Sequence, residues 1–174
     1  MRRWLWLNAL TVLFWLWLRL VRGWKSPLLY WIFRKTIYRG ELPDIWSWAK
    51  QANMDDFSAL LNSYDYRWDF LRGIADNSPQ EPDFFFGERG ANRDCDAWAR
   101  MWLWWAQEQG YSAWEVAIAN GITRLHMITV IERGDKYTLC DYWPRGDFNS
   151  MEDVKNYYRK GRYPNLVWVL NKGV

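Results

Sequence analysis

The hydrophobic pattern of this 174-residue chain changes after residue 39. Residues 4–18 are apolar apart from two polar positions, and a second apolar run, residues 28–33, follows Pro27. From Asp44 onward, apolar and polar residues are mixed as they are in a soluble protein. The pattern therefore predicts two parts: an apolar, Trp-rich N-terminal segment over residues 1–39, and a globular domain over residues 40–174.

The N-terminal segment is typical of a membrane-associating helix. Counted from Trp4 to Val21, 18 helical residues span about 27 Å, slightly less than the ~30 Å hydrocarbon core of a bilayer. A polar stripe from Asn8 to Arg22 equally suits a helix lying in the plane of the interface. A third interpretation is a helix packed on the domain itself. We expect membrane association and leave spanning and in-plane insertion open.

In the globular part, helical spacing and capping residues predict four helices. A helix over residues 95–109 has Asp94 as its N-cap and ends at Gly110. A short helix is predicted over residues 44–49. A longer one is capped by Asp55 or Asp56 and has apolar residues at helical spacing as far as Leu71. A fourth helix begins at a capping box at Ser150 and runs through Arg159.

Two β-rich runs, residues 125–131 and 136–142, predict a hairpin. A two-residue turn at Arg133-Gly134, or a four-residue loop, gives a register in which paired residue numbers sum to 267, so that His126 lies opposite Asp141. Directly opposed side chains share one face of a sheet, with Cβ atoms about 5 Å apart. An odd-numbered loop would place them on opposite faces. Residues 166–170 are a possible further strand, and residues 145–147 are expected to form a turn.

Charge is distributed unevenly along the chain. Residues 1–39 hold eight of the 23 basic residues and no acidic residue, which leaves 15 basic against 20 acidic residues in the remainder. The basic residues lie among tryptophan and leucine, which favours a lipid partner over nucleic acid. If the first run spans the membrane, the larger basic excess on its C-terminal side places the domain in the cytoplasm.

Three side chains provide the parts of a cysteine nucleophile site. Cys95 lies in the first turn of a predicted helix, where the helix dipole and Arg93 favour the thiolate. His126 is the only histidine in the sequence, so no other imidazole can act as the base for Cys95. Asp141 can orient that imidazole. The competing interpretation is a Cys95–Cys140 disulfide, which is close to incompatible with the triad because Cys140 and Asp141 face opposite sides of a strand.

These residues and their order resemble the transglutaminase-like superfamily of papain-type cysteine proteases. The segments that carry the resemblance are residues 90–99 around Cys95, residues 125–130 around His126 and residues 137–142 around Asp141. The resemblance implies an α+β fold with a papain/transglutaminase-like core, in which the nucleophile helix packs on an antiparallel sheet. It implies Cys95 as nucleophile, His126 as general acid/base and Asp141 as the residue that orients it. For the oxyanion, the Cys95 backbone N–H is one candidate donor and Asn92 a second.

We therefore expect a membrane-tethered amide hydrolase or acyl transferase of peptidase, deamidase or crosslinking type. Its substrate would be a protein or peptide and its lipid contact would be residues 1–39, with no cofactor, metal or nucleic acid. The alternative is a non-enzymatic, membrane-anchored interaction or structural module that retains the fold. Asp94 and Asp96 favour that alternative, because two carboxylates beside Cys95 oppose a thiolate.

Overall fold

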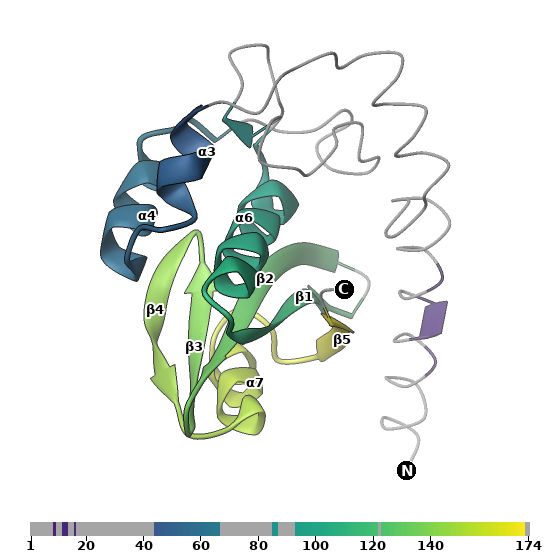
Figure 1. Ribbon diagram of the computed structural model, residues 1–174. Coiled ribbons are helices and arrows are strands. Elements are labelled where there is room, and N and C mark those ends of the chain that lie inside the picture. The colour runs from purple at the N-terminus through teal and green to yellow at the C-terminus, as the bar shows by residue number, and fades with distance from the viewer. Residues whose placement is uncertain are drawn as a thin grey trace.

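A computed structural model of the chain describes residues 9, 12–13, 16, 44–66, 85–86, 93–121 and 123–172 (Figure 1). Its centre is an antiparallel sheet of five strands in the order β4-β3-β2-β1-β5. The strands are β1 (Ser112–Asn120), β2 (Thr123–Arg133), β3 (Lys136–Asp141), β4 (Trp143–Phe148) and β5 (Leu166–Lys172). The predicted α+β class is confirmed, as are the strands expected over residues 125–131, 136–142 and 166–170.

Two strands were not predicted. β1 is buried on both faces, so it lacks the alternation of polar and apolar residues that marks a half-buried strand. β4 contains residues 145–147, and the prediction of a turn there is wrong. Glycine and aspartate favour turns locally, but here the pairing of β4 with β3 decides their conformation.

The β2–β3 hairpin forms, but its predicted register is wrong by two residues. Val130 pairs with Leu139 and Arg133 with Lys136, so paired numbers sum to 269. The turn is therefore Gly134–Asp135, and Gly134 has a φ of +64°. A two-residue turn with glycine in this conformation at its first position matches the twist of the strands. Because the shift is an even number, His126 and Asp141 still share a face, as diagonal neighbours.

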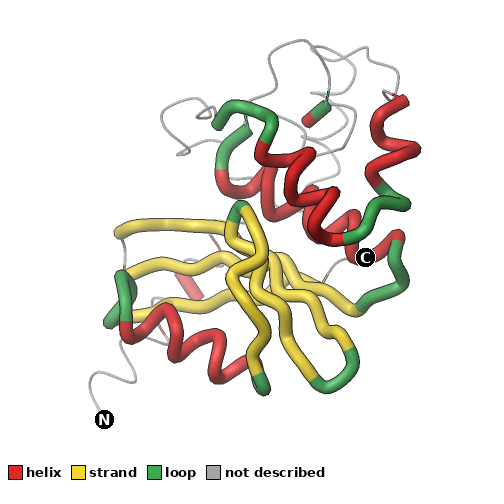
Figure 2. The backbone as a smooth tube through the Cα atoms, turned by 90° about the vertical axis from the view of Figure 1, so that its left-hand side faces the viewer, coloured by secondary structure: helices red, strands yellow, loops and turns green. Residues whose placement is uncertain are grey.

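Helices cover both faces of the sheet. Figure 2 shows α6 (Cys95–Glu108) on one side with α3 (Asp44–Ala49) and α4 (Met54–Asn62), and α7 (Met151–Lys160) on the other. The α6 side is filled largely by aromatic side chains such as Phe57, Trp102 and Trp105. On the α7 side, the strand residues include Ile128 and Leu139.

The predicted helix over residues 95–109 is confirmed, with helical residues from Cys95 to Glu108. The Gly110 N–H donates to the Gln107 carbonyl at 3.0 Å and the Tyr111 N–H to the Ala106 carbonyl at 2.8 Å. With Gly110 at a φ of +78°, these two bonds are the Schellman arrangement that closes a helix. Ending α6 there allows β1 to begin at Ser112.

The N-cap of α4 corrects one prediction. Asn53, and neither Asp55 nor Asp56, occupies this position, and its Oδ1 accepts a hydrogen bond from the Asp56 N–H at 2.9 Å. The two aspartates lie in the first turn, where negative charge is favourable. The expected continuation of this helix to Leu71 lies outside the described residues.

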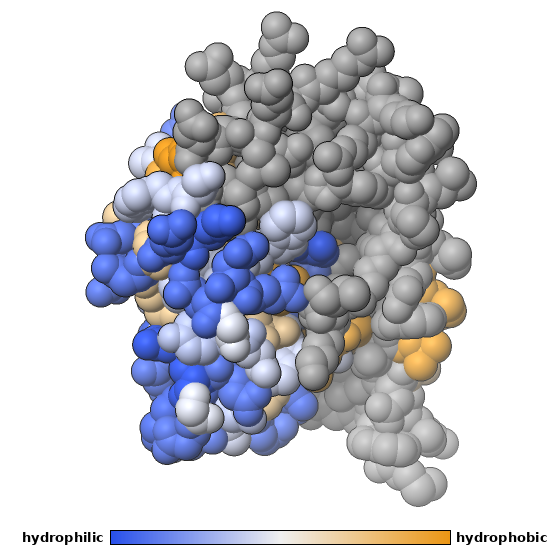
Figure 3. All heavy atoms as spheres, in the orientation of Figure 1, coloured by the Kyte–Doolittle hydropathy of each residue, from blue (hydrophilic) through white to orange (hydrophobic). Residues whose placement is uncertain are grey.

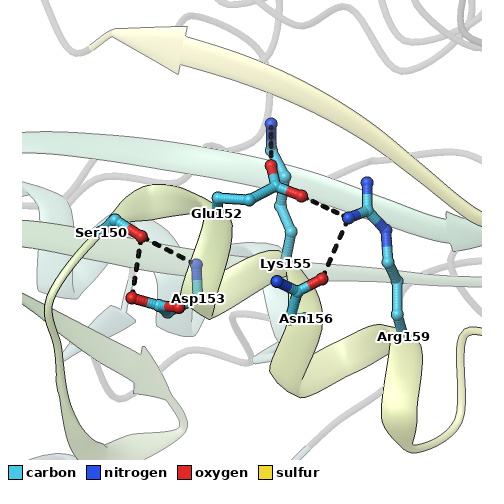
Figure 4. A network of polar contacts seen from close by, with 6 residues as sticks. All are labelled: Ser150, Glu152, Asp153, Lys155, Asn156 and Arg159. Atoms are coloured by element: carbon cyan, nitrogen blue, oxygen red, sulfur yellow. Dashed lines mark hydrogen bonds and ion pairs between the residues drawn. The ribbon is translucent and has the colours of Figure 1, made fainter.

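The predicted helix that begins at Ser150 is confirmed as α7. The Ser150 hydroxyl accepts from the Asp153 N–H at 3.1 Å and donates to the Asp153 carboxylate at 2.8 Å (Figure 4). Farther along, Glu152 pairs with both Lys155 and Arg159 on the exposed side of the helix. This cap sets where α7 begins, and therefore which of its tyrosines face the sheet.

Within residues 1–39 the structure describes Ala9, Val12, Leu13 and Leu16, all helical and exposed. Figure 3 shows hydrophobic atoms at the place of the purple N-terminal stretch of Figure 1, whereas the surface over α4 and β4 is largely hydrophilic. The remainder of the predicted Trp-rich helix lies outside the described residues. Among the residues that are described, no helix has the length and apolar character needed to cross a bilayer.

Candidate functional site

Cys95 is the first residue of α6. The preceding residue, Asp94, is the N-cap by position, with an extended backbone, although its side chain does not cap the helix. The Cys95 side chain packs against a small apolar cluster that includes Ala99 and Met127. Met127 follows His126 in β2, and consecutive strand side chains point to opposite faces. Cys95 therefore packs on the α6 face of the sheet, next to the strand that carries His126 on its other face.

Side chains from distant segments hold the first turn of α6 in place. Buried Arg93 donates from Nε to the Phe85 carbonyl at 2.6 Å, and its guanidinium lies 4.8 Å from the centre of the Tyr64 ring. Trp98 donates from Nε1 to the Arg93 carbonyl at 3.2 Å. These contacts orient the helix N-terminus, whose dipole favours negative charge.

His126 and Asp141 form a close pair, as the sequence predicted. Nε2 of His126 lies 2.7 Å from Oδ1 of Asp141, and both side chains are largely buried. They lie on the face of the sheet that carries Ile128 and Leu139, the face covered by α7. Because Asp141 engages Nε2, Nδ1 is the ring nitrogen left for proton exchange.

Asp141 receives further support from α7 and β4. The Tyr158 hydroxyl donates to Oδ2 at 3.0 Å, and the Arg145 guanidinium lies 3.9 Å from the same oxygen. Burial by itself raises the pKa of Asp141. The hydrogen bond and charge of His126, followed by the Tyr158 hydroxyl and Arg145, outweigh burial and hold this pKa below its ordinary value. The carboxylate is therefore ionised at neutral pH.

Tyr142 connects α6 to His126. Its ring centre lies 5.4 Å from that of His126 and 5.9 Å from that of Trp98 in α6. Its carbonyl accepts a hydrogen bond from Nε1 of Trp102 at 3.1 Å. Its φ of +63° is unusual for a residue with a side chain, and such strain persists where the surroundings enforce it. Burial, then the nearby Cys95, raise the pKa of its hydroxyl.

An open groove of about 780 Å³ lies on the α7 side of the sheet and contains the His126–Asp141 pair. Its remaining lining comes from β2, from the residue between β3 and β4, from β4, and from α7 and the residues that follow it. The lining residues are Leu125, His126, Asp141, Tyr142, Arg145, Tyr157, Tyr158, Gly161, Arg162 and Tyr163. Such a concave surface beside a carboxylate–imidazole pair can hold an extended substrate.

The remaining predicted residues divide into two groups. Cys140 is buried on the α6 face, where burial raises the pKa of its thiol, and it forms no disulfide with Cys95. Asn92, the second oxyanion candidate, lies outside the described residues. Sequence reasoning missed Tyr158 and Arg145, whose only sequence signals are the capping box that positions α7 and the closeness of Arg145 to Asp141 along the chain.

One group of donor atoms has metal-ligating chemistry. Those of Asp94, Cys95 and Asp96 lie within 4.8 Å of one another, and both carboxylates are buried. The three residues are consecutive, and this is the one such group among the residues the structure describes. Buried carboxylates on both sides of Cys95 work against its thiolate, and this observation favours the non-enzymatic alternative.

No family model, curated protein or solved structure matches this chain.

Proposed function

We propose that the protein is a cysteine-dependent amide hydrolase or acyl transferase with Cys95, His126 and Asp141 as its triad. The observation that carries the proposal is the 2.7 Å contact between His126 Nε2 and Asp141 Oδ1. The ring of Tyr142 lies 5.4 Å from that of His126 and 5.9 Å from that of Trp98 in α6, the helix that begins at Cys95, and this link supports the proposal. The resemblance to transglutaminase-like enzymes, which rests on these same residues, supports the proposal.

The reaction follows from the properties of these groups. The Cys95 thiolate attacks the carbonyl carbon of a substrate amide, and a C–S bond forms while the carbonyl oxygen becomes an oxyanion. His126, protonated on Nδ1, gives that proton to the amide nitrogen as the C–N bond breaks, and a thioester remains. His126 then takes a proton from water or from an amine. The attack of that nucleophile breaks the C–S bond and restores the thiolate.

Asp141 orients the imidazole through Nε2 and stabilises its protonated form. The Cys95 backbone N–H, at the N-terminus of α6, is the proposed donor to the oxyanion, with Asn92 as the second candidate. Water as acceptor gives peptidase or deamidase chemistry, whereas a lysine amine gives crosslinking. No cofactor enters the proposed reaction.

We further propose that residues 1–39 tether the protein to a membrane, with the domain on the cytoplasmic side. Val12 and Leu13 are 58% and 61% exposed, and with Ala9 and Leu16 they follow helical spacing along one face. An exposed apolar stripe in a segment with eight basic residues and no acidic residue suits an anionic lipid surface. Deleting residues 1–39 should release the chain from anionic vesicles without unfolding it. A truncated chain that aggregates would instead place this segment within the folded domain.

The decisive experiment measures the alkylation rate of each cysteine by iodoacetamide as a function of pH, in wild type and in His126→Ala. Cys140 serves as the internal reference because it is 1% exposed and burial raises its pKa. Rapid labelling of Cys95 that extends below pH 8.5, an ordinary thiol pKa, and requires His126 supports the enzyme. Slow labelling of Cys95 that is indifferent to His126 would support the membrane-anchored structural module, with Asp94 and Asp96 suppressing the thiolate.

A further inference from the structure

The groove beside the His126–Asp141 pair has a cationic and aromatic character that the proposed reaction does not require. Among the lining residues that the structure describes, one is acidic, Asp141, and two are arginines, Arg145 and Arg162. Four tyrosines supply most of the remaining surface. Asp141 contacts His126, Tyr158 and, at 3.9 Å, Arg145, so a single carboxylate faces two guanidinium groups in the described lining.

A β-bulge turns Arg145 toward this groove. Cys140 pairs with Pro144 and Leu139 with Gly146, so Arg145 is the residue of β4 that has no partner on β3. Leu139 belongs to the face covered by α7, and a bulge places its two adjacent residues on one side of the strand. Arg145 therefore extends over the α7 face, next to a glycine that leaves it space.

The Arg145 guanidinium is held in one orientation. Its central carbon lies 3.9 Å from the centre of the Trp143 ring, a stacking contact. Among the described carboxylates, Oδ2 of Asp141 is its ion-pair partner, at 3.9 Å, which is longer than a hydrogen bond, and the Arg145 side chain remains 29% exposed. A stacked guanidinium presents its N–H groups edge-on, in the planar fork that matches a carboxylate.

One carbonyl in the last turn of α7 is already occupied by hydrogen bonds. A helix C-terminus carries partial negative charge on its last carbonyls, which would repel an anion. The Tyr158 carbonyl, however, accepts hydrogen bonds from the N–H groups of both Gly161 and Tyr163, each at 3.1 Å. Arg162 then follows directly after this capped turn.

From these observations we infer that the groove recognises a carboxylate on the peptide substrate, with Arg145 as its main ligand. This inference rests on the proposed function, since it names the substrate class of the same site. The enzyme then acts on amides close to a C-terminal carboxylate or to an acidic side chain. The tyrosines pack against the peptide chain that carries the carboxylate.

A first test compares iodoacetate with iodoacetamide as alkylating agents for Cys95 in the full chain. The two reagents are similar in size and differ by one negative charge. A synthetic peptide of residues 90–100 gives the ratio of their rates for a thiol outside the folded site. We expect the iodoacetate-to-iodoacetamide ratio at Cys95 to exceed the peptide's ratio by about tenfold, as one charge-assisted contact allows.

Arg145→Gln should return this ratio to the peptide's value, and Arg145→Lys should restore part of it. Arg159→Gln is the matched control because Arg159 lies on α7, pairs with Glu152 and is outside the groove lining. The inference is overturned if the wild-type ratio equals that of the peptide, or if Arg159→Gln lowers it as much as Arg145→Gln.

A second test does not depend on thiol chemistry. His126 is the only histidine and lines the groove, so its imidazole NMR signals report directly on what occupies it. In the full-length Cys95→Ala chain, N-acetyl-diglycine should shift these signals and its C-terminal amide should not. N-acetylglutamic acid α-amide tests a side-chain carboxylate in the same way.

The shift of the His126 signals caused by the carboxylate peptide should disappear in Arg145→Gln. Equal shifts with the carboxylate and amide peptides, or with inorganic phosphate at the same concentration, would overturn the carboxylate assignment. Slow, His126-independent alkylation of Cys95 together with carboxylate-specific NMR shifts would refute the enzyme while retaining the binding site. Rapid, His126-dependent alkylation of Cys95 without carboxylate-specific NMR shifts would support the enzyme and refute the carboxylate site.

Discussion

The Tyr158 hydroxyl offers the sharpest test of how the His126–Asp141 pair is held. Tyr158 is 6% exposed, and its hydroxyl donates to Asp141 Oδ2 at 3.0 Å. A hydrogen bond to a charged group contributes about 1.5–3 kcal/mol, and one between neutral groups about 0.5–1.5 kcal/mol. Tyr158→Phe removes this bond and almost nothing else. We expect it to lower the free energy of unfolding by about 2 kcal/mol at pH 7.

The same bond predicts a pH dependence. Because folding lowers the pKa of Asp141, its carboxylate contributes stability above the ordinary value of about 3.9 and loses that stability as pH falls through the folded value. Once the pH has fallen below that folded pKa, Asp141 is protonated and the Tyr158 bond becomes one between neutral groups. The difference between wild type and Tyr158→Phe should shrink toward about 1 kcal/mol.

Urea unfolding of the full chain between pH 2.5 and 7, followed by tryptophan fluorescence, measures both effects. Tyr157→Phe is the matched control, since Tyr157 is 47% exposed on the same helix and its hydroxyl bonds to none of the described residues. The reasoning fails if the two variants lose equal stability at pH 7. It also fails if the loss in Tyr158→Phe does not change with pH.

Other predictions concern the framework around the site. Arg100→Met should cost about 3 kcal/mol of unfolding free energy, because it removes the Arg100 guanidinium from the fully buried Glu115 carboxylate. The Arg100→Met/Glu115→Gln double variant should recover most of this loss, and urea titrations in which the double variant is no more stable would contradict the prediction. Phe57→Ala should lower the free energy of unfolding by about 3–5 kcal/mol, because the buried Phe57 ring packs on two tryptophans of α6. An unchanged melting temperature in calorimetry would refute that packing. Gly134→Ala should lower the free energy of unfolding by about 1–2 kcal/mol. The loss comes from the positive φ alone, because no atom lies within 4 Å of the added carbon. Asp135→Ala should be nearly neutral in the same urea assay.

Local patterns were sufficient for the elements that bear the predicted triad. The boundaries of α6 follow from a run without glycine or proline that ends in a glycine closing motif, and that signal is contained within the helix. The alternation of side chains in a hairpin is likewise local, so His126 and Asp141 share a face in any register with an even shift. The roles of these residues, and of Cys95, stay predictions until thiol reactivity is measured.

Other features depended on contacts between distant segments. The hairpin register was decided by Gly134 taking the first turn position, and β1 and β4 formed where pairing and burial outweighed local preference. The hydroxyl that donates to Asp141 belongs to Tyr158 in α7, 17 residues farther along the chain. A β-bulge in β4 places Arg145 in the lining of the groove. A sequence specifies which chemical groups are present and how they alternate locally. The tertiary structure determines which of them meet, because strand register and helix packing are set by the whole core.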